Sequence, residues 1–245
     1  KIEEGSIPFK GSQGAGYTLE ALLNIERNSF KTPDFLGIEI KTFSKGGKIS
    51  LMTPTADLGD EGNSPFRDFM SQYGSPSVNG DGSTRFTGMH RVGKVNNKTN
   101  LELKVKGYDS FLDEFSSNPS EIFIGLFSHN HNHLVSGWSF TKLLNSWNKK
   151  HAEVFYIEYE KRKYIGVNDN HDFEYRYTGN IINGKGTSIK NYFKRVSDGL
   201  VVYDPAHSIY LGGIAKQRPQ WRISVTSKFA KNLSVFYDLV EEIDI

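Results

Sequence analysis

Residues 33–41 read PDFLGIEIK, and the expected architecture starts from this segment. Its apolar side chains alternate with Gly, Glu and Lys, which predicts a β-strand over Phe35–Phe43 with one buried face. Glu39 and Lys41 are two positions apart, so both side chains project from the other face, with Cα atoms ~6.5 Å apart. The apolar run Ile49–Met52 is expected to be the hairpin partner of this strand.

The two carboxylates of this segment suggest a metal site. Asp34 stands where the strand begins, so its carboxylate can converge with that of Glu39. Carboxylate oxygens, completed by waters and a phosphate oxygen, suit Mg²⁺, for which Mn²⁺ is expected to substitute. Lys41 would then orient a metal-bound water or stabilise developing charge, and Glu20 on an upstream helix would add a third acid. The same spacing also occurs on ordinary solvated strand faces, so the pattern alone leaves both interpretations open.

Strand and helix patterns alternate along the rest of the chain. Further strands are expected at Leu101–Tyr108, Glu121–Phe127, Ala152–Tyr159, Phe173–Tyr177 and Trp221–Val225. Helices are expected at Tyr17–Asn28, Pro65–Gln72, Phe140–Asn148, Ser188–Val196 and Lys228–Val240. Thr18 is the expected N-cap of the first helix, and its leucines predict an apolar face. With no repeat and no clear linker, this mixture predicts one α/β or α+β domain over residues 1–245.

Composition restricts the function classes. The chain of 245 residues contains no cysteine, which excludes disulfides, thiolate metal sites and cysteine nucleophiles, and suits a cytoplasmic location. No stretch of about 20 apolar residues is present, so no membrane span is expected. The net charge of +2 predicts that any nucleic-acid surface is a local patch. Because residue 1 is Lys, we expect the sequence to be a fragment of a longer chain.

Donors suited to DNA gather in the segment after residue 215. Arg can bridge guanine O6 and N7, and Gln can pair with adenine N6 and N7. The candidates for base contact are Lys216, Gln217, Arg218, Gln220 and Arg222. Alternatively, Arg222 only solvates the outer face of a core strand.

Other basic residues are candidates for contacts to the DNA backbone. They are Lys142, Lys149, Lys150, His151, Arg85, His90 and Arg91. For the lysines, a favourable position at a helix C-terminus is an alternative explanation. The run His129–His133 alternates His with Asn, which could indicate a zinc or nickel site, but no Cys or carboxylate completes it, and a polar loop is favoured.

Several motifs resemble the MvaI/BcnI family of type II restriction endonucleases. That family is related to the mismatch-repair nicking enzyme MutH within the PD-(D/E)xK nuclease superfamily. The matching segments follow the family order: GAGYTLE at 14–20, PDFLGIEIKT at 33–42, LMTP at 51–54, FTGMH at 86–90, WSF at 138–140, WNKKH at 147–151 and QRPQWRI at 217–223. The resemblance therefore covers most of the chain.

The resemblance implies a fold and a set of roles. The fold would be a central mixed β-sheet flanked by helices, with a catalytic lobe and a DNA-recognition lobe forming a cleft around duplex DNA bound by a monomer. Asp34 and Glu39 would be metal ligands, Lys41 the catalytic lysine and Glu20 an accessory acid. The expected activity is Mg²⁺-dependent, sequence-specific cleavage of double-stranded DNA. Two alternatives stay open: a MutH-like enzyme that nicks one strand, and a DNA-binding module without catalysis.

Overall fold

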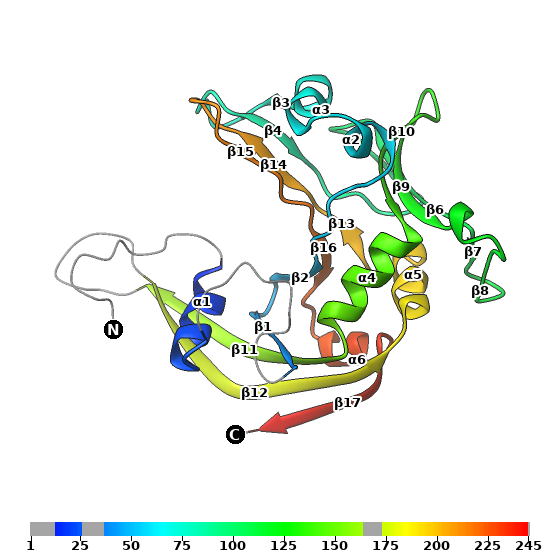
Figure 1. Ribbon diagram of the computed structural model, residues 1–245. Coiled ribbons are helices and arrows are strands. Elements are labelled where there is room, and N and C mark those ends of the chain that lie inside the picture. Colours follow the sequence, from blue (N-terminus) through cyan, green and yellow to red (C-terminus); the bar gives the residue numbers. More distant parts are fainter. Residues whose placement is uncertain (1–12, 26–36, 164–172, 245) are drawn as a thin grey trace. The chain divides into compact units, whose positions relative to one another are not determined.

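The computed structural model describes residues 13–25, 37–163 and 173–244, and the chain forms two compact units (Figure 1). Unit 1 comprises Lys1–Ile49, Lys150–Gly186 and Val225–Ile245. Unit 2 comprises Ser50–Lys149 and Thr187–Ser224. The assignment of a single domain with a catalytic and a recognition lobe stays a prediction.

Unit 1 is built on a four-stranded sheet with the order β1-β11-β12-β17. Its elements are α1 (Gly14–Leu22), β1 (Glu39–Phe43), β11 (Glu153–Lys163), β12 (Phe173–Thr187), α6 (Phe229–Leu233) and β17 (Tyr237–Asp244). Strand β1 pairs in parallel with β11, whereas β11 and β12 are antiparallel, so the sheet is mixed. Its core includes Phe43, Tyr156 and Phe229. The ring centroid of Phe229 lies 4.8 Å from that of Phe43 and 5.7 Å from that of Tyr156.

The predicted hairpin between residues 35–43 and 49–52 is wrong. Strand β2 (Lys48–Met52) does follow β1 after a short turn, in which the Gly47 N–H donates to the Ser44 carbonyl at 3.0 Å. It belongs to a separate sheet with the order β13-β16-β2, in which β13 is Val202–Tyr203 and β16 is Trp221–Ser224, while β1 pairs with β11. The face of β1 expected to be buried is also different, because Ile38 and Ile40 remain partly exposed and Glu39 is buried.

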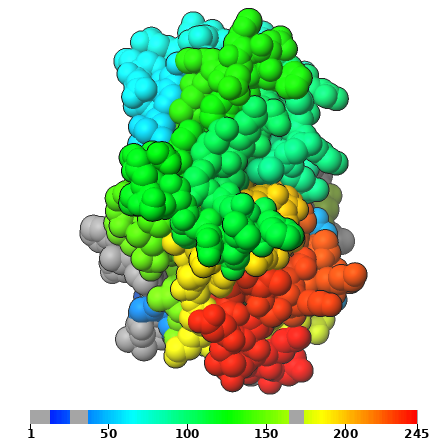
Figure 2. All heavy atoms as spheres, turned by 90° about the vertical axis from the view of Figure 1, so that its right-hand side faces the viewer, coloured from blue at the N-terminus to red at the C-terminus, as the bar shows by residue number. Residues whose placement is uncertain are grey.

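Two predicted helices differ from the observed elements. The first begins earlier than expected, with Gln13 at its N-cap, and the Thr18 hydroxyl donates to the Gly14 carbonyl instead of capping the helix. It ends at Leu22, and two of its three predicted apolar-face leucines are exposed. The predicted helix Lys228–Val240 is a five-residue helix, α6, followed by strand β17. Figure 2 shows β17, in red, at the molecular surface.

Unit 2 contains several small antiparallel sheets. One has the order β10-β9-β6-β5, another β15-β14-β4-β3, and a two-stranded sheet joins β7 and β8. Its early elements are α2 (Gly59–Asn63), α3 (Phe66–Tyr73), β3 (Ser75–Pro76), β4 (Thr84–Thr87), β5 (Val95–Asn96), β6 (Leu101–Lys106), β7 (Tyr108–Asp109), β8 (Glu114–Phe115), a 3₁₀ turn (Pro119–Glu121), β9 (Phe123–Ser128) and β10 (Leu134–Ser139). Its later elements are α4 (Phe140–Lys150, whose last residue is assigned to unit 1), α5 (Ile189–Ser197), β13 (Val202–Tyr203), β14 (Ala206–Ile209), β15 (Ala215–Lys216) and β16 (Trp221–Ser224).

The core of unit 2 is aromatic. The rings of Trp138, Tyr203 and Trp221 are fully buried, with centroids 4.6 to 5.1 Å apart. Because a buried indole N–H needs an acceptor, Trp138 donates its Nε1–H to the Pro54 carbonyl at 2.9 Å. This cluster joins β10, β13 and β16, and so fixes β16, which begins within the predicted DNA-contact segment Lys216–Arg222.

The fold class predicted from the sequence, a mixed α+β protein, is confirmed. Most strands and helices expected from periodicity are present within a few residues of their predicted bounds. No helix in the described part of the chain is long and apolar enough to span a membrane.

Candidate active site

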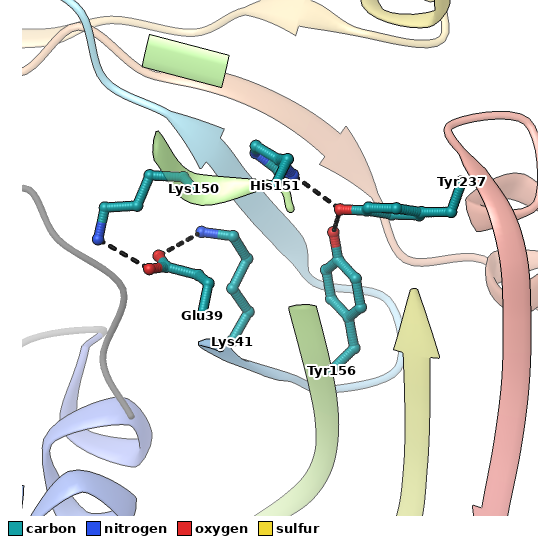
Figure 3. Close-up of polar contacts among 6 residues, drawn as sticks. All are labelled: Glu39, Lys41, Lys150, His151, Tyr156 and Tyr237. Carbon is teal, nitrogen blue, oxygen red and sulfur yellow. Dashed lines mark hydrogen bonds and ion pairs between the residues drawn. The ribbon is translucent and has the colours of Figure 1, made fainter. Parts of the chain in front are cut away.

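Glu39 and Lys41 lie together on β1, as their spacing predicted. The Lys41 ammonium lies 3.1 Å from Oε1 of Glu39, and both side chains come from the same face of the strand (Figure 3). Strand β1 is held in register against β11, with Glu39 opposite Val154 and Lys41 opposite Tyr156. Parallel pairing to a buried neighbour therefore fixes the backbone beneath both functional groups.

The carboxylate of Glu39 is buried, with only 6% of the residue exposed. Its second oxygen, Oε2, accepts a hydrogen bond from the Lys150 ammonium at 2.8 Å, and the two groups form an ion pair. A carboxylate is costly to bury unless cations or donors satisfy it, and here two ammonium groups share it. The pairing with Glu39 places Lys150 within this site, and its contact to the DNA backbone stays a prediction.

A second polar group lies beside Glu39 and Lys41. The Tyr237 hydroxyl lies 2.8 Å from the Tyr156 hydroxyl and 2.7 Å from Nδ1 of His151 (Figure 3). Burial, together with the negative charge of Glu39, raises the pKa of Tyr156, and burial likewise raises that of Tyr237. Both phenols therefore stay protonated and act as hydrogen-bond donors. Sequence reasoning missed this network, because Tyr237 lies 86 positions from His151 and 81 from Tyr156.

His151 takes part in this network rather than lying at the surface. Its side chain is fully buried, which is at odds with the predicted contact to DNA in this conformation. Gly184 leaves the space that the network requires, because a Cβ at that position would lie 2.6 Å from the ring of Tyr237. The close packing of Tyr237 over β12 thus holds the His151–Tyr237–Tyr156 network in place.

The remaining predicted acids are Glu20 and Asp34. Helix α1 lies against β1, since a Cβ at Gly16 would be 3.8 Å from the Thr42 hydroxyl and 3.9 Å from a Glu20 carboxylate oxygen. The helix therefore lies against β1 at Thr42, whose side chain alternates with those of Glu39 and Lys41 along the strand. Asp34 lies outside the described residues.

The chemistry of the Glu39 carboxylate fits a divalent cation. It is a hard oxygen donor in a buried position, and its two oxygens attract two positive charges in this structure. Mg²⁺ would compete with Lys41 and Lys150 for the same oxygens. Within residues 13–25, 37–163 and 173–244, no three His, Cys, Asp or Glu side chains are grouped to hold a metal.

The predicted base-contact segment lies in unit 2, on and after β15. Lys216 and Arg218 are exposed, whereas Gln220 and Arg222 are partly buried. Nη1 of Arg222, on β16, donates to Asp204 at 3.1 Å, so part of its guanidinium is engaged within the protein. Of the two arginines, Arg218 is the one whose side chain is available at the surface.

Gln217 has a structural partner that sequence reasoning missed. Its Nε2 donates to Oε1 of Glu61, a buried acid on α2, at 2.9 Å. Glu61 also accepts from Ser136 at 2.6 Å, and Nε2 of His207 lies 3.2 Å away. Burial alone would raise the pKa of Glu61, but the hydrogen bonds outweigh it and the pKa lies below its ordinary value. This buried acid anchors the segment that presents Lys216 and Arg218.

The other basic candidates occupy different environments. Arg85, on β4, donates to Asp81 at 2.9 Å and lies 4.8 Å from the ring centroid of Tyr210. His90 is fully buried and bonds to Thr99 at 2.8 Å, and burial lowers its pKa to about 4, so it is neutral. Burial is at odds with a direct DNA contact by His90. Arg91 is partly buried, Lys142 is partly buried on α4, and Lys149 is exposed there.

The His129–His133 run is a loop, as favoured from the sequence. It joins β9 to β10, and His133 lies 2.8 Å from Asp60 while His129 lies 3.9 Å from Glu102. His131 and His133 line a shallow pocket of about 410 Å³ with Tyr73 and Asn100. The imidazoles face separate acids, so they do not form one metal-ligand set.

Two solved structures are similar to this chain. A structure titled "Restriction endonuclease MvaI-cognate DNA substrate complex" superposes with a TM-score of 0.70 and 19% identity, covering 96% of this chain and 89% of that one. A structure of "Restriction endonuclease MvaI in the absence of DNA" gives a TM-score of 0.51 and 17% identity, covering 92% and 83%. These similarities show a shared fold. A search of curated proteins finds no match.

The family comparison is more specific than the structural one. The sequence model of the MvaI/BcnI restriction endonuclease family matches residues 2–231, which includes the Glu39–Lys41 strand and the Lys216–Arg222 segment. By that match over nearly its whole length, the chain belongs to the MvaI/BcnI restriction endonuclease family and is a site-specific deoxyribonuclease.

Proposed function

We propose that the protein is a Mg²⁺-dependent type II restriction endonuclease that hydrolyses both strands of duplex DNA as a monomer. The observation that carries this proposal is the buried Glu39 carboxylate, shared by Lys41 and Lys150 on a strand that the family match includes. A buried acid bearing two cations is suited to exchange one of them for a metal and a phosphate. The DNA complex of MvaI, which has the same fold, supports duplex DNA as the substrate.

In this proposal Asp34 and Glu39 would hold Mg²⁺, which would neutralise charge at the phosphate and lower the pKa of a bound water. The Lys41 ammonium lies 3.1 Å from Oε1 of Glu39, and so within reach of a phosphate and a water at this carboxylate. Its ammonium orients the attacking water or stabilises charge developing on the phosphate. Glu20, on α1, acts as an accessory acid. The network of Tyr156, Tyr237 and His151 supports the strand beneath Lys41.

The first test uses supercoiled plasmid and the purified protein alone. Mg²⁺ or Mn²⁺ should yield linear DNA, whereas a MutH-like nickase would leave persistent nicked circles. Ca²⁺ should permit binding with little cleavage, because its looser coordination positions the water poorly. EDTA should stop the reaction. Full activity in EDTA contradicts the carboxylate–metal proposal, and intact plasmid with tight DNA binding in Mg²⁺ would indicate a binding module.

A second prediction separates base reading from backbone binding. Arg218→Ala should weaken binding at one base pair of the site by ~1–3 kcal/mol and relax discrimination there, because a bidentate base contact is lost. Lys149→Ala should weaken binding to all sequences alike and flatten the salt dependence, because a phosphate contact releases counterions whatever the base. Affinities for the cognate duplex and single-base variants, measured across a salt series, check both.

Arg222→Ala provides the matched comparison for Arg218→Ala. Because Arg222 is paired with Asp204, Arg222→Ala should lower the free energy of unfolding. It should leave the discrimination between the cognate duplex and its single-base variants unchanged. If Arg218→Ala lowers the affinity for every duplex equally, the segment binds the backbone and the base contacts lie elsewhere.

A further inference from the structure

The Glu39 carboxylate faces more positive charge than its own neutralisation requires. Its Oε1 lies 3.1 Å from the Lys41 ammonium and its Oε2 lies 2.8 Å from the Lys150 ammonium (Figure 3). The formal charge of these three side chains is +1, from one carboxylate and two ammonium groups. Asp34, the second proposed ligand, would bring that sum to zero. A divalent cation that binds here therefore enters a site whose proposed ligands are already balanced by lysines.

Lys150 is held at this carboxylate by the fold. It is the last residue of α4, where the negative end of the helix dipole favours an ammonium group. The next residue, His151, is fully buried and lies 2.7 Å from the Tyr237 hydroxyl, which fixes the chain directly after Lys150. On the other side of the pair, Glu39 is fixed by the pairing of β1 with β11. The contact between Lys150 and Glu39 thus joins two anchored elements.

A fixed ammonium group at this distance has a large effect on any other cation at the carboxylate. Coulomb energies rise as the distance and the effective dielectric constant fall. The side chain of Glu39 is only 8% exposed and that of Lys150 only 25%, so water screens their charges weakly. A divalent cation at Glu39 would be repelled by the Lys150 ammonium and would compete with it for the carboxylate. Without a metal, the same ammonium offsets the cost of burying the carboxylate.

We propose that Lys150 is a resident counter-cation of the catalytic carboxylate, which compensates Glu39 in the metal-free enzyme and holds its affinity for divalent cations low. The enzyme thereby remains folded without metal and binds the metal reversibly. The inference rests on the proposed function and deepens it, because it names a residue that sets the metal affinity without being a metal ligand.

The test measures Mn²⁺ binding to the DNA-free protein, by the loss of the electron paramagnetic resonance signal of free Mn²⁺. Lys150→Gln removes the charge but keeps an N–H donor for Oε2, whereas Lys150→Arg keeps both. Lys150→Gln should bind Mn²⁺ about ten- to a hundredfold more tightly than the wild type, because a positive charge beside the carboxylate is lost. Lys150→Arg should bind Mn²⁺ as the wild type does.

Lys185→Gln is the matched control. Lys185 belongs to the same unit and pairs with a glutamate, Glu153, at 3.4 Å, but its side chain is 59% exposed. Its replacement removes the same charge from the protein and should leave the Mn²⁺ affinity unchanged. An equal gain in affinity in Lys185→Gln would overturn the inference, since the effect would then follow the net charge of the protein.

Thermal unfolding gives a second readout. A ligand that binds the folded state stabilises it in proportion to its affinity, so Mn²⁺ should raise the Tm of Lys150→Gln more than that of the wild type. Equal shifts, or wild-type Mn²⁺ affinity in Lys150→Gln, overturn the inference, as does the absence of Mn²⁺ binding to either protein. A Lys150→Gln protein that is unfolded and that Mn²⁺ does not refold overturns it too, because the metal should replace the missing charge. Cleavage that persists in EDTA would instead contradict the proposed function itself.

Discussion

Replacing Lys41 by alanine is expected to slow DNA cleavage about a hundred- to a thousand-fold, the usual cost of removing one charge-stabilising group. The ammonium of Lys41 is held 3.1 Å from Glu39 in a buried environment, where an electrostatic contact is stronger than in water. Single-turnover cleavage rates measure the effect. DNA affinity in Ca²⁺ should change little, because Lys150 still pairs with Glu39 and keeps its charge compensated.

Lys45→Ala is the matched control for Lys41→Ala. Lys45 follows the same strand, but its side chain is 89% exposed and pairs loosely with Glu158 at 3.5 Å. Its replacement should leave the cleavage rate within a few-fold of the wild type.

Asp34→Ala is expected to reduce cleavage as strongly as Lys41→Ala, because it removes a proposed metal ligand. A Lys41→Ala or Asp34→Ala variant that cuts within a few-fold of the wild-type rate removes that residue from the mechanism.

The shared face of Glu39 and Lys41 could be predicted because strand alternation is a local property. Two residues at spacing two point the same way wherever the strand packs. The burial of Glu39 and its pairing with Lys150 could not be predicted in this way. Lys150 is 111 positions away, and only the tertiary structure brings its ammonium to Oε2. The same limit applies to His151, whose surface role was inferred from a basic segment and whose burial depends on Tyr237.

The C-terminal segment shows a competing rule prevailing over periodicity. Leu233, Phe236, Tyr237 and Val240 have the i, i+3, i+4, i+7 spacing that predicts one helix. The helix stops at Leu233, and Tyr237 begins an edge strand that joins the sheet beside β12. Backbone pairing to an open sheet edge, together with the Tyr237 hydrogen bonds, outweighs a helical propensity worth a few tenths of a kcal/mol per residue. Isolated sequence patterns do not contain that information.

Glu61→Ala is expected to destabilise the protein by about 3–5 kcal/mol, although Glu61 lies outside the proposed catalytic cluster. Three groups use its carboxylate: the buried Ser136 and His207, and the partly buried Gln217. The Arg218 N–H donates to Nδ1 of His207, so the ring proton on Nε2 is the one that faces Glu61. Removing the acid leaves these donors unsatisfied, at about 1–3 kcal/mol each.

The pH dependence of unfolding distinguishes this role from simple packing. The folded-state pKa of Glu61 is lowered, so its contribution is fully present above the unfolded-state pKa of about 4.3 and is lost as pH falls through the folded-state value. The stability gap between the wild type and Glu61→Ala should therefore narrow in acid. Urea unfolding of both proteins at pH 7 and below pH 4 measures it, with the exposed Glu114→Ala as control, expected within about 0.5 kcal/mol of the wild type. A loss under 1 kcal/mol at pH 7, or a gap that does not change with pH, would show that Glu61 does not anchor the DNA-contact segment as a buried carboxylate.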